Sequence, residues 1–133
     1  ARPHARARAH SLRTPPPGGN ILLWKRKAER YLIESGLPYT IVHPGGLLNE
    51  EGGRRELVVG VDDTIEGTDN RSVPREDVAA VMVQALLQPE YRCRSFDLVS
   101  KPEGEGVVTQ DFGALLAEGL HGRNTDYTLG ATA

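Results

Sequence analysis

The chain has 133 residues, enough for one domain, and only 38% of them are apolar, so a core can form but is modest in size. The formal net charge of −2 argues against a nucleic-acid-binding surface, and the single cysteine excludes an internal disulfide and a cysteine-type metal cluster. No apolar run approaches the roughly 18 residues that cross a bilayer, which leads us to expect a soluble, intracellular protein.

Residues 1–19 differ in composition from everything that follows. They hold four arginines and no acidic residue, and they end in three prolines and two glycines. We predict a disordered leader, since no hydrophobic period is present. Three interpretations stay open: an organelle transit peptide, a basic arm that touches nucleic acid, and a non-native junction in a cut or misjoined chain. The absence of a starting Met and the change of composition at Asn20 favour the junction.

Residues 20–35 have the pattern of an amphipathic helix. Asn20 is a suitable N-cap, and Gly36 followed by Pro38 ends the helix. Apolar residues recur at helical spacing, and we expect them to form one face, with the tryptophan in the core. These residues are Ile21, Trp24, Ala28, Tyr31 and Leu32.

Short apolar segments predict the strands. Residues 39–42 are apolar throughout rather than alternating, as in a strand covered on both faces. Residues 56–61 and 94–99 are a second and a third strand, and residues 64–66 are expected to pair back on the second strand as a hairpin. Residues 72–73 are expected to be a short extended piece.

Residues 75–87 predict a second helix. Pro74 suits its first turn, Glu76 and Asp77 suit the positive end of its dipole, and Pro89 ends it. Its apolar stripe consists of Val78, Val81, Met82, Ala85 and Leu86.

The end of the chain predicts a third, shorter helix that contains Phe112, Leu115 and Leu116, with Thr109 as its cap. From residue 119 to residue 133 the chain is glycine-rich and polar, and we expect a flexible tail. Helices and strands alternate through the sequence. We therefore predict an α/β fold, a partial Rossmann-like doubly wound sheet that is mainly parallel and has flanking helices.

Three segments carry a resemblance to a known family: residues 25–47, 73–79 and 95–104. They resemble the C-terminal half of the atypical short-chain dehydrogenase/reductases of the plant NAD(P)-binding, NmrA-like type, which have a Rossmann fold. The resemblance covers residues 20–118. It implies that these residues form the C-terminal part of an NAD(P)-binding domain.

The resemblance implies a catalytic lysine. Active members place a Tyr and a Lys four residues apart on one helix, where the Lys holds the nicotinamide ribose and the Tyr transfers a proton. Lys25 matches the Lys, but Ile21 stands where the Tyr is expected. Tyr31 faces another side of the helix and is a poor substitute. The proton donor is therefore missing from this helix.

The resemblance also implies a cofactor-binding turn. Family members use a Pro-Gly turn whose backbone approaches the nicotinamide, and Pro44, Gly45 and Gly46 match it. His43 stands where many relatives have Arg. It is either an acid or base near neutral pH or, the interpretation we favour, a histidine that bonds a backbone carbonyl. The predicted cofactor-binding residues are Lys25, His43, Pro44, Gly45 and Gly46.

The sequence contains no G-x-x-G-x-x-G loop after a strand, the element that holds the pyrophosphate at a helix N-terminus. We therefore expect the chain alone to bind NADP or NAD weakly or not at all. In the full-length parent the family implies a dinucleotide and a small-molecule substrate.

Three functions stay open. The first is the C-terminal part of a truncated NAD(P)-dependent reductase-like protein, whose family chemistry is hydride transfer to a small carbonyl or double bond. The second is a non-catalytic interaction or sensor module, favoured by the missing Tyr. The third is a functionless fragment, in which an exposed sheet edge leads to self-association.

We expect no nucleic-acid or membrane partner. We also expect no metal site, because the acidic pairs at residues 50–51 and 62–63 lack ordered ligand spacing. The expected location is the cytoplasm, or the chloroplast if the leader is a transit peptide.

Overall fold

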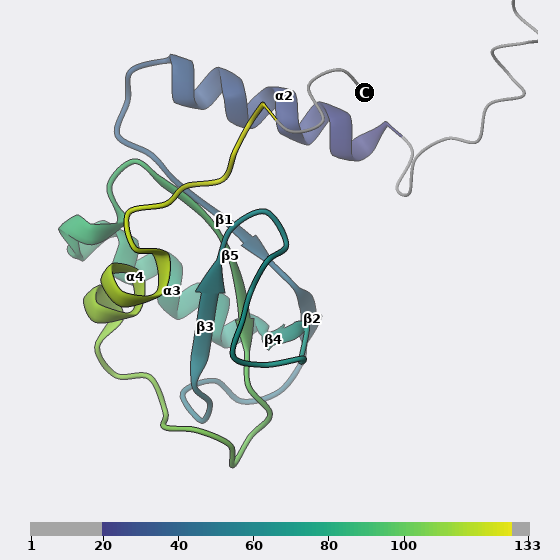
Figure 1. Ribbon diagram of the computed structural model, residues 1–133, viewed down its shortest axis with the longest axis vertical. Helices are drawn as coiled ribbons and strands as arrows, with labels where there is room; N and C mark the ends of the chain where they lie inside the picture. The colour runs from purple at the N-terminus through teal and green to yellow at the C-terminus, as the bar shows by residue number, and fades with distance from the viewer. Residues whose placement is uncertain (1–19, 129–133) are drawn as a thin grey trace, which may run out of the picture.

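The computed structural model describes residues 20–128, so the predicted leader and residues 129–133 lie outside the described part of the chain (Figure 1). The described elements alternate as predicted, which confirms the α/β class. In chain order they are α2 (Ile21–Glu34), β1 (Thr40–Pro44), β2 (Gly46–Leu48), β3 (Leu57–Gly60), β4 (Ser72–Pro74), α3 (Arg75–Leu87), the 3₁₀ helix η1 (Pro89–Tyr91), β5 (Arg94–Ser100) and α4 (Phe112–Leu120).

Strand β5 is the centre of the main sheet, whose order is β1-β5-β3 (Figure 1). Strand β1 runs parallel to β5, and β3 runs antiparallel to it. A second, smaller sheet pairs β2 with β4 in parallel. The arrangement is a partial Rossmann-like sheet in which β1 and β3 are the two edge strands.

The core lies where β3, β5, η1, α3 and α4 meet. Tyr91 links three of these elements, because its ring packs edge-on against Phe96 at 5.9 Å and its hydroxyl donates a hydrogen bond to the Phe112 carbonyl at 2.9 Å. Val81 of α3 and Leu98 of β5 are fully buried beside it. Burying side chains of this size stabilises the fold by about 1.5–3 kcal/mol each.

Helix α2 forms where it was predicted, but its packing prediction is wrong. Ile21, Trp24 and Tyr31 are 61%, 63% and 79% exposed, and no residue of α2 is buried. Trp24 is not in the core, and Lys27 lies over its ring at 4.5 Å. The amphipathic pattern gave the helix correctly, but no described element packs over its apolar face. Asn20 stands at the N-cap position without a side-chain cap bond.

Helix α3 and its N-terminal acids agree with the prediction in position. Asp77 is buried and accepts a hydrogen bond from the backbone N–H of residue 53 at 2.9 Å, which ties the preceding loop to the helix. The predicted apolar stripe is buried in the core at one residue and exposed to solvent at others. Val81 is fully buried, whereas Met82 and Leu86 are 59% and 86% exposed.

The predicted hairpin at residues 64–66 is wrong. Asp62 and Asp63 adopt left-handed backbone angles, with φ of 54° and 58°, and the backbone N–H of Thr64 donates to the Val61 carbonyl at 3.0 Å. The chain therefore closes a tight turn after β3. It continues as a loop instead of pairing back on the strand.

The cap of α4 is Asp111 rather than Thr109. The Asp111 carboxylate accepts a hydrogen bond from the Ala114 backbone N–H at 2.9 Å, while the Thr109 hydroxyl accepts one from the Leu57 backbone N–H at 2.8 Å. The predicted cap was wrong because Thr109 is used to hold the edge of β3. The helix also runs to Leu120, two residues into the predicted tail.

We expect Asp111→Ala to lower the free energy of unfolding by about 1 kcal/mol, because it removes the only side-chain cap at the described start of α4. Urea denaturation followed by circular dichroism measures this change. Gln110→Ala is the matched control, since Gln110 is exposed and is not the cap. Equal stability of both variants would show that the cap contributes nothing.

Candidate functional site

A cavity of about 220 Å³ lies at the carboxyl end of β1. The carboxyl ends of parallel strands are where open α/β sheets bind ligands. Three of the predicted cofactor-binding residues are brought together here. The cavity is lined by His43, Pro44, Gly45, Asp63, Ile65, Arg71, Asp97 and Val99.

The Pro-Gly turn that forms one wall is fixed by backbone contacts. The Gly45 N–H donates to the Leu98 carbonyl at 2.9 Å, and the Gly46 N–H donates to the Arg71 carbonyl at 2.8 Å. A Cβ atom on Gly45 would lie 2.3 Å from the Arg71 carbonyl oxygen, so only glycine fits. Gly46 belongs to β2 and does not line the cavity.

His43 bridges two carboxylates. Its Nε2 lies 2.7 Å from Glu29 Oε1 on α2, and its Nδ1 lies 3.4 Å from Asp97 Oδ1 on β5. The expectation that His43 bonds a backbone carbonyl is therefore wrong. Hydrogen bonding to Asp97 raises the pKa of His43 above its usual 6.5, burial opposes this rise, and the bond to Glu29 adds to it. The bridge favours the imidazolium form, whose two N–H groups both have an acceptor.

The C-terminal segment reaches the same bridge. The Tyr127 hydroxyl donates to Glu29 Oε1 at 2.6 Å and lies 2.7 Å from the Ser95 hydroxyl. Burial and the contact with Glu29 raise the pKa of Tyr127, so the phenol stays protonated at neutral pH. Arg26 stacks on the Tyr127 ring at 4.5 Å and donates to the Asp126 carbonyl. The C-terminal segment thus runs back from α4 and contacts α2 through these bonds (Figure 1).

Lys25 is exposed and does not line the cavity. It lies four residues before Glu29 and therefore on the same face of α2, one turn from the bridge. The structure thus places Lys25 one helical turn from Glu29 and does not join it to the Pro-Gly turn. Ile21, one turn further back, is exposed and offers no hydroxyl.

Three residues of the polar cluster around His43 were not predicted from the sequence: Glu29, Asp97 and Tyr127. Asp97 carried a usable signal, because it is the one charged residue inside the apolar segment that forms β5 after Arg94. Glu29 also carried a usable signal, because it lies four residues after Lys25 and therefore on the same helix face. Tyr127 carried no signal, since it lies in a polar segment remote in sequence.

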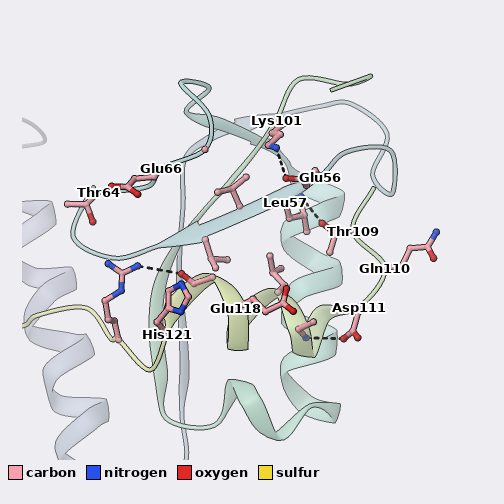
Figure 2. Close-up of a pocket in the computed structure, with 17 residues that line it drawn as sticks. Glu56, Leu57, Thr64, Glu66, Lys101, Thr109, Gln110, Asp111, Glu118 and His121 are labelled. Carbon is pink, nitrogen blue, oxygen red and sulfur yellow. Dashed lines mark hydrogen bonds and ion pairs between the residues drawn. The ribbon is translucent and has the colours of Figure 1, made fainter. Parts of the chain in front are cut away.

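A larger cavity, about 890 Å³, lies between β3 and α4 (Figure 2). None of the predicted site residues lines it. Its polar groups hold the fold together: Lys101 pairs with Glu56 at 2.7 Å, and Thr109 and Asp111 make the two bonds described above. Size alone therefore does not make this cavity the better candidate.

Residues 20–128 show neither a metal-binding cluster nor a membrane-spanning helix. These residues contain no group of three or more His, Cys, Asp or Glu side chains arranged to hold a metal ion. None of the helices in this range is long and apolar enough to cross a membrane.

Comparison with known proteins gives a family. A family model described as NAD(P)H-binding matches residues 4–89. The chain is 54% identical over 99 residues to an uncharacterised chloroplastic protein of Arabidopsis thaliana, covering 74% of this chain and 30% of that protein. It is 55% identical over 100 residues to sanguinarine reductase of Eschscholzia californica, covering 75% and 37%.

A more distant match is an uncharacterised sugar epimerase of Bacillus subtilis, 35% identical over 86 residues, covering 65% of this chain and 36% of that protein. The chain spans about a third of the length of these relatives.

We expect the bridge to make stability depend on pH. Because the folded-state pKa of His43 is raised, its contribution is fully present below about pH 6.5 and is lost as pH rises through the folded-state pKa. His43→Gln should lower the free energy of unfolding by about 1–2 kcal/mol at pH 6, between the values for exposed and buried ion pairs, and by less at pH 9. Urea denaturation at both pH values measures this difference.

The control for this experiment is His121→Asn. His121 is exposed at the left-handed end of α4, a backbone conformation that Asn tolerates. This variant should keep the wild-type pH dependence. A pH dependence that survives in His43→Gln and disappears in His121→Asn would contradict the assignment.

Proposed function

We propose that the cavity at the end of β1 forms one wall of an NAD(P)H site, the wall that faces the nicotinamide. The proposal starts from the family, because the chain belongs to the NAD(P)H-binding family, of the atypical short-chain dehydrogenase/reductase type. The observation that carries this proposal is the meeting of His43, Pro44 and Gly45 on one cavity. The turn beside it admits only glycine, which lets backbone approach a flat ring closely.

The size of the cavity suits the nicotinamide end and not the whole cofactor. Pockets that enclose drug-sized ligands measure roughly 300–1,000 Å³, whereas this cavity measures about 220 Å³. The sequence also has no glycine-rich loop for the pyrophosphate. We therefore propose weak binding of the dinucleotide by this chain, with NADP and NAD as the two candidate cofactors.

The proposed roles of the residues follow from their contacts. A bound nicotinamide supplies or accepts a hydride. His43 holds the wall of the cavity, because both its ring nitrogens are occupied by Glu29 and Asp97. Lys25 has an exposed ammonium group one helical turn from Glu29 and is the residue we assign to the nicotinamide ribose. Gly46 supports the turn from β2.

Catalysis is a separate question from binding. The likeness to sanguinarine reductase supports a reductase role for a longer protein of which this segment is the C-terminal part, with hydride transfer to a small carbonyl or double bond. Ile21 in place of a proton donor favours the alternative, a sensor or interaction module that binds cofactor without turnover.

We also propose a chloroplast location, supported by the chloroplastic relative from Arabidopsis thaliana. The cytoplasm is the alternative. The native gene product, tagged at its C-terminus, should coincide with chlorophyll autofluorescence in leaf cells. A tag signal spread through the cytosol would count against the chloroplast.

Binding can be tested on the chain itself by NMR. Titration with reduced nicotinamide mononucleotide should shift the backbone amide resonances of His43, Gly45 and Gly46, because this half of the cofactor carries the ring. ADP, which represents the other half, should shift them much less. The proposal fails if the mononucleotide leaves these amides unchanged or if ADP shifts them equally.

The role of Lys25 can be tested in the same titration. Lys25→Ala should weaken binding of the mononucleotide about fivefold, since an exposed charge contact contributes up to about 1 kcal/mol. Lys27→Ala is the matched control, because Lys27 is exposed on the same helix and stacks on Trp24. Equal effects of the two substitutions would assign the change to overall charge and not to Lys25.

A further inference from the structure

The C-terminal segment, residues 124–127, takes over a place on β5 that β3 leaves free. Strand β3 pairs with β5 only as far as Asp97. The Lys101 N–H donates to the Glu56 carbonyl on the β3 side, so Ser95, six residues earlier, directs its backbone to that side as well. The segment runs past this part of β5 on its way from α4 to α2 (Figure 1).

Backbone and side chains bond the C-terminal segment to β5. The Ser95 N–H donates to the Asn124 side-chain carbonyl at 3.1 Å, and the Thr125 N–H donates to the Ser95 carbonyl at 2.9 Å. The Asn124 amide group donates to the Cys93 carbonyl at 3.1 Å. Ser95 and Thr125 are buried, and their hydroxyls lie 3.0 Å apart. Hydrogen bonds shielded from water in this way are stronger than exposed ones, so the segment is held firmly on the strand.

Tyr127 joins the C-terminal segment to His43 through one carboxylate. The Tyr127 hydroxyl lies 2.6 Å from Glu29 Oε1, and the same oxygen lies 2.7 Å from His43 Nε2. On its other side the hydroxyl lies 2.7 Å from the buried Ser95 hydroxyl. The phenol therefore fixes where the carboxylate lies, and the carboxylate holds the imidazole ring that lines the β1 cavity.

Asp126 joins the C-terminal segment to the turn after β3. Its N–H donates to the Asp62 carboxylate at 2.9 Å. The next residue, Asp63, lines the cavity and donates its N–H to Asp97 Oδ2 at 2.8 Å. Both residues of the turn have left-handed backbone angles, which are unfavourable for a residue with a side chain. The two bonds hold the turn in that conformation.

We propose that the C-terminal segment positions two walls of the β1 cavity, with Tyr127 as the positioning residue for His43 and Asp126 as the positioning residue for the turn. Neither residue lines the cavity, so each acts through the group that it holds. All of these contacts join two described residues and need no partner strand at the β1 edge of the sheet. The consequence for cofactor binding rests on the function proposed above.

The first test needs no cofactor. Tyr127→Phe removes the hydroxyl and keeps the ring on which Arg26 stacks. We expect the Glu29 carboxylate, once the phenol no longer holds it, to turn away from His43 into water. The pKa of His43 then falls toward its usual 6.5, although Asp97 still maintains part of the rise. NMR titration of the His43 ring protons measures the midpoint.

Tyr31→Phe is the matched control for this titration. It removes the same hydroxyl from a tyrosine of α2 that is 79% exposed. Tyr31 lies two residues after Glu29 and therefore on another side of the helix. The His43 midpoint should keep its wild-type value in this variant. Two-dimensional amide spectra of both variants verify that the fold is retained.

The second test measures the consequence for binding. Tyr127→Phe should weaken binding of reduced nicotinamide mononucleotide about fivefold, the effect of losing one hydrogen bond, and Tyr31→Phe should not. Asp62→Gly removes the acceptor of the Asp126 N–H, and glycine tolerates the left-handed angle at this position. This variant should weaken binding by a similar factor and leave the His43 midpoint in place.

Two results would overturn the proposal. The first is a His43 midpoint that stays or rises in Tyr127→Phe, because Glu29 then keeps its place without the phenol. The second is mononucleotide binding that both Tyr127→Phe and Asp62→Gly leave unchanged. A wild-type chain that does not bind the mononucleotide contradicts the proposed function instead, and the His43 midpoint then decides the role of Tyr127.

Discussion

The ion-paired bridge through His43 is the constraint on which the site depends. Helix α2 buries no residue, so hydrophobic burial contributes little to its position. The helix is held instead by Glu29, which reaches His43 on β1 and, through it, Asp97 on β5. Tyr127 donates a second hydrogen bond to the Glu29 carboxylate. The place of Lys25, one turn away, therefore depends on a polar cluster whose strength changes with protonation.

Local sequence predicted most elements and few of their partners. Helical spacing, Gly36 and the proline before α3 located two helices, because these signals act within a few residues. Which element packs on which is decided by distant residues. Trp24 lies on the apolar face of its helix, but no described element packs over it. Thr109 has a hydroxyl that could cap a helix, but this hydroxyl accepts a hydrogen bond from β3 instead. Neither outcome is encoded near the residue concerned.

The same division applies to the site. The resemblance marked Pro44 and Gly45, which the structure places on one cavity. It did not mark Asp97 or Tyr127, whose roles arise only when β5 and the C-terminal segment approach β1. The chain also spans about a third of its relatives' length. The described residues present the β1 cavity that we propose as the nicotinamide wall, and the sequence has no glycine-rich loop for the pyrophosphate.

The central claim is that the cavity at the end of β1 holds the nicotinamide ring. The most direct measurement is intermolecular nuclear Overhauser effects between the ring protons of reduced nicotinamide mononucleotide and this chain. The account predicts contacts to Pro44 and to the Gly45 Hα protons. Contacts confined to residues of the β3–α4 cavity, such as Thr64 and Leu115, would contradict it.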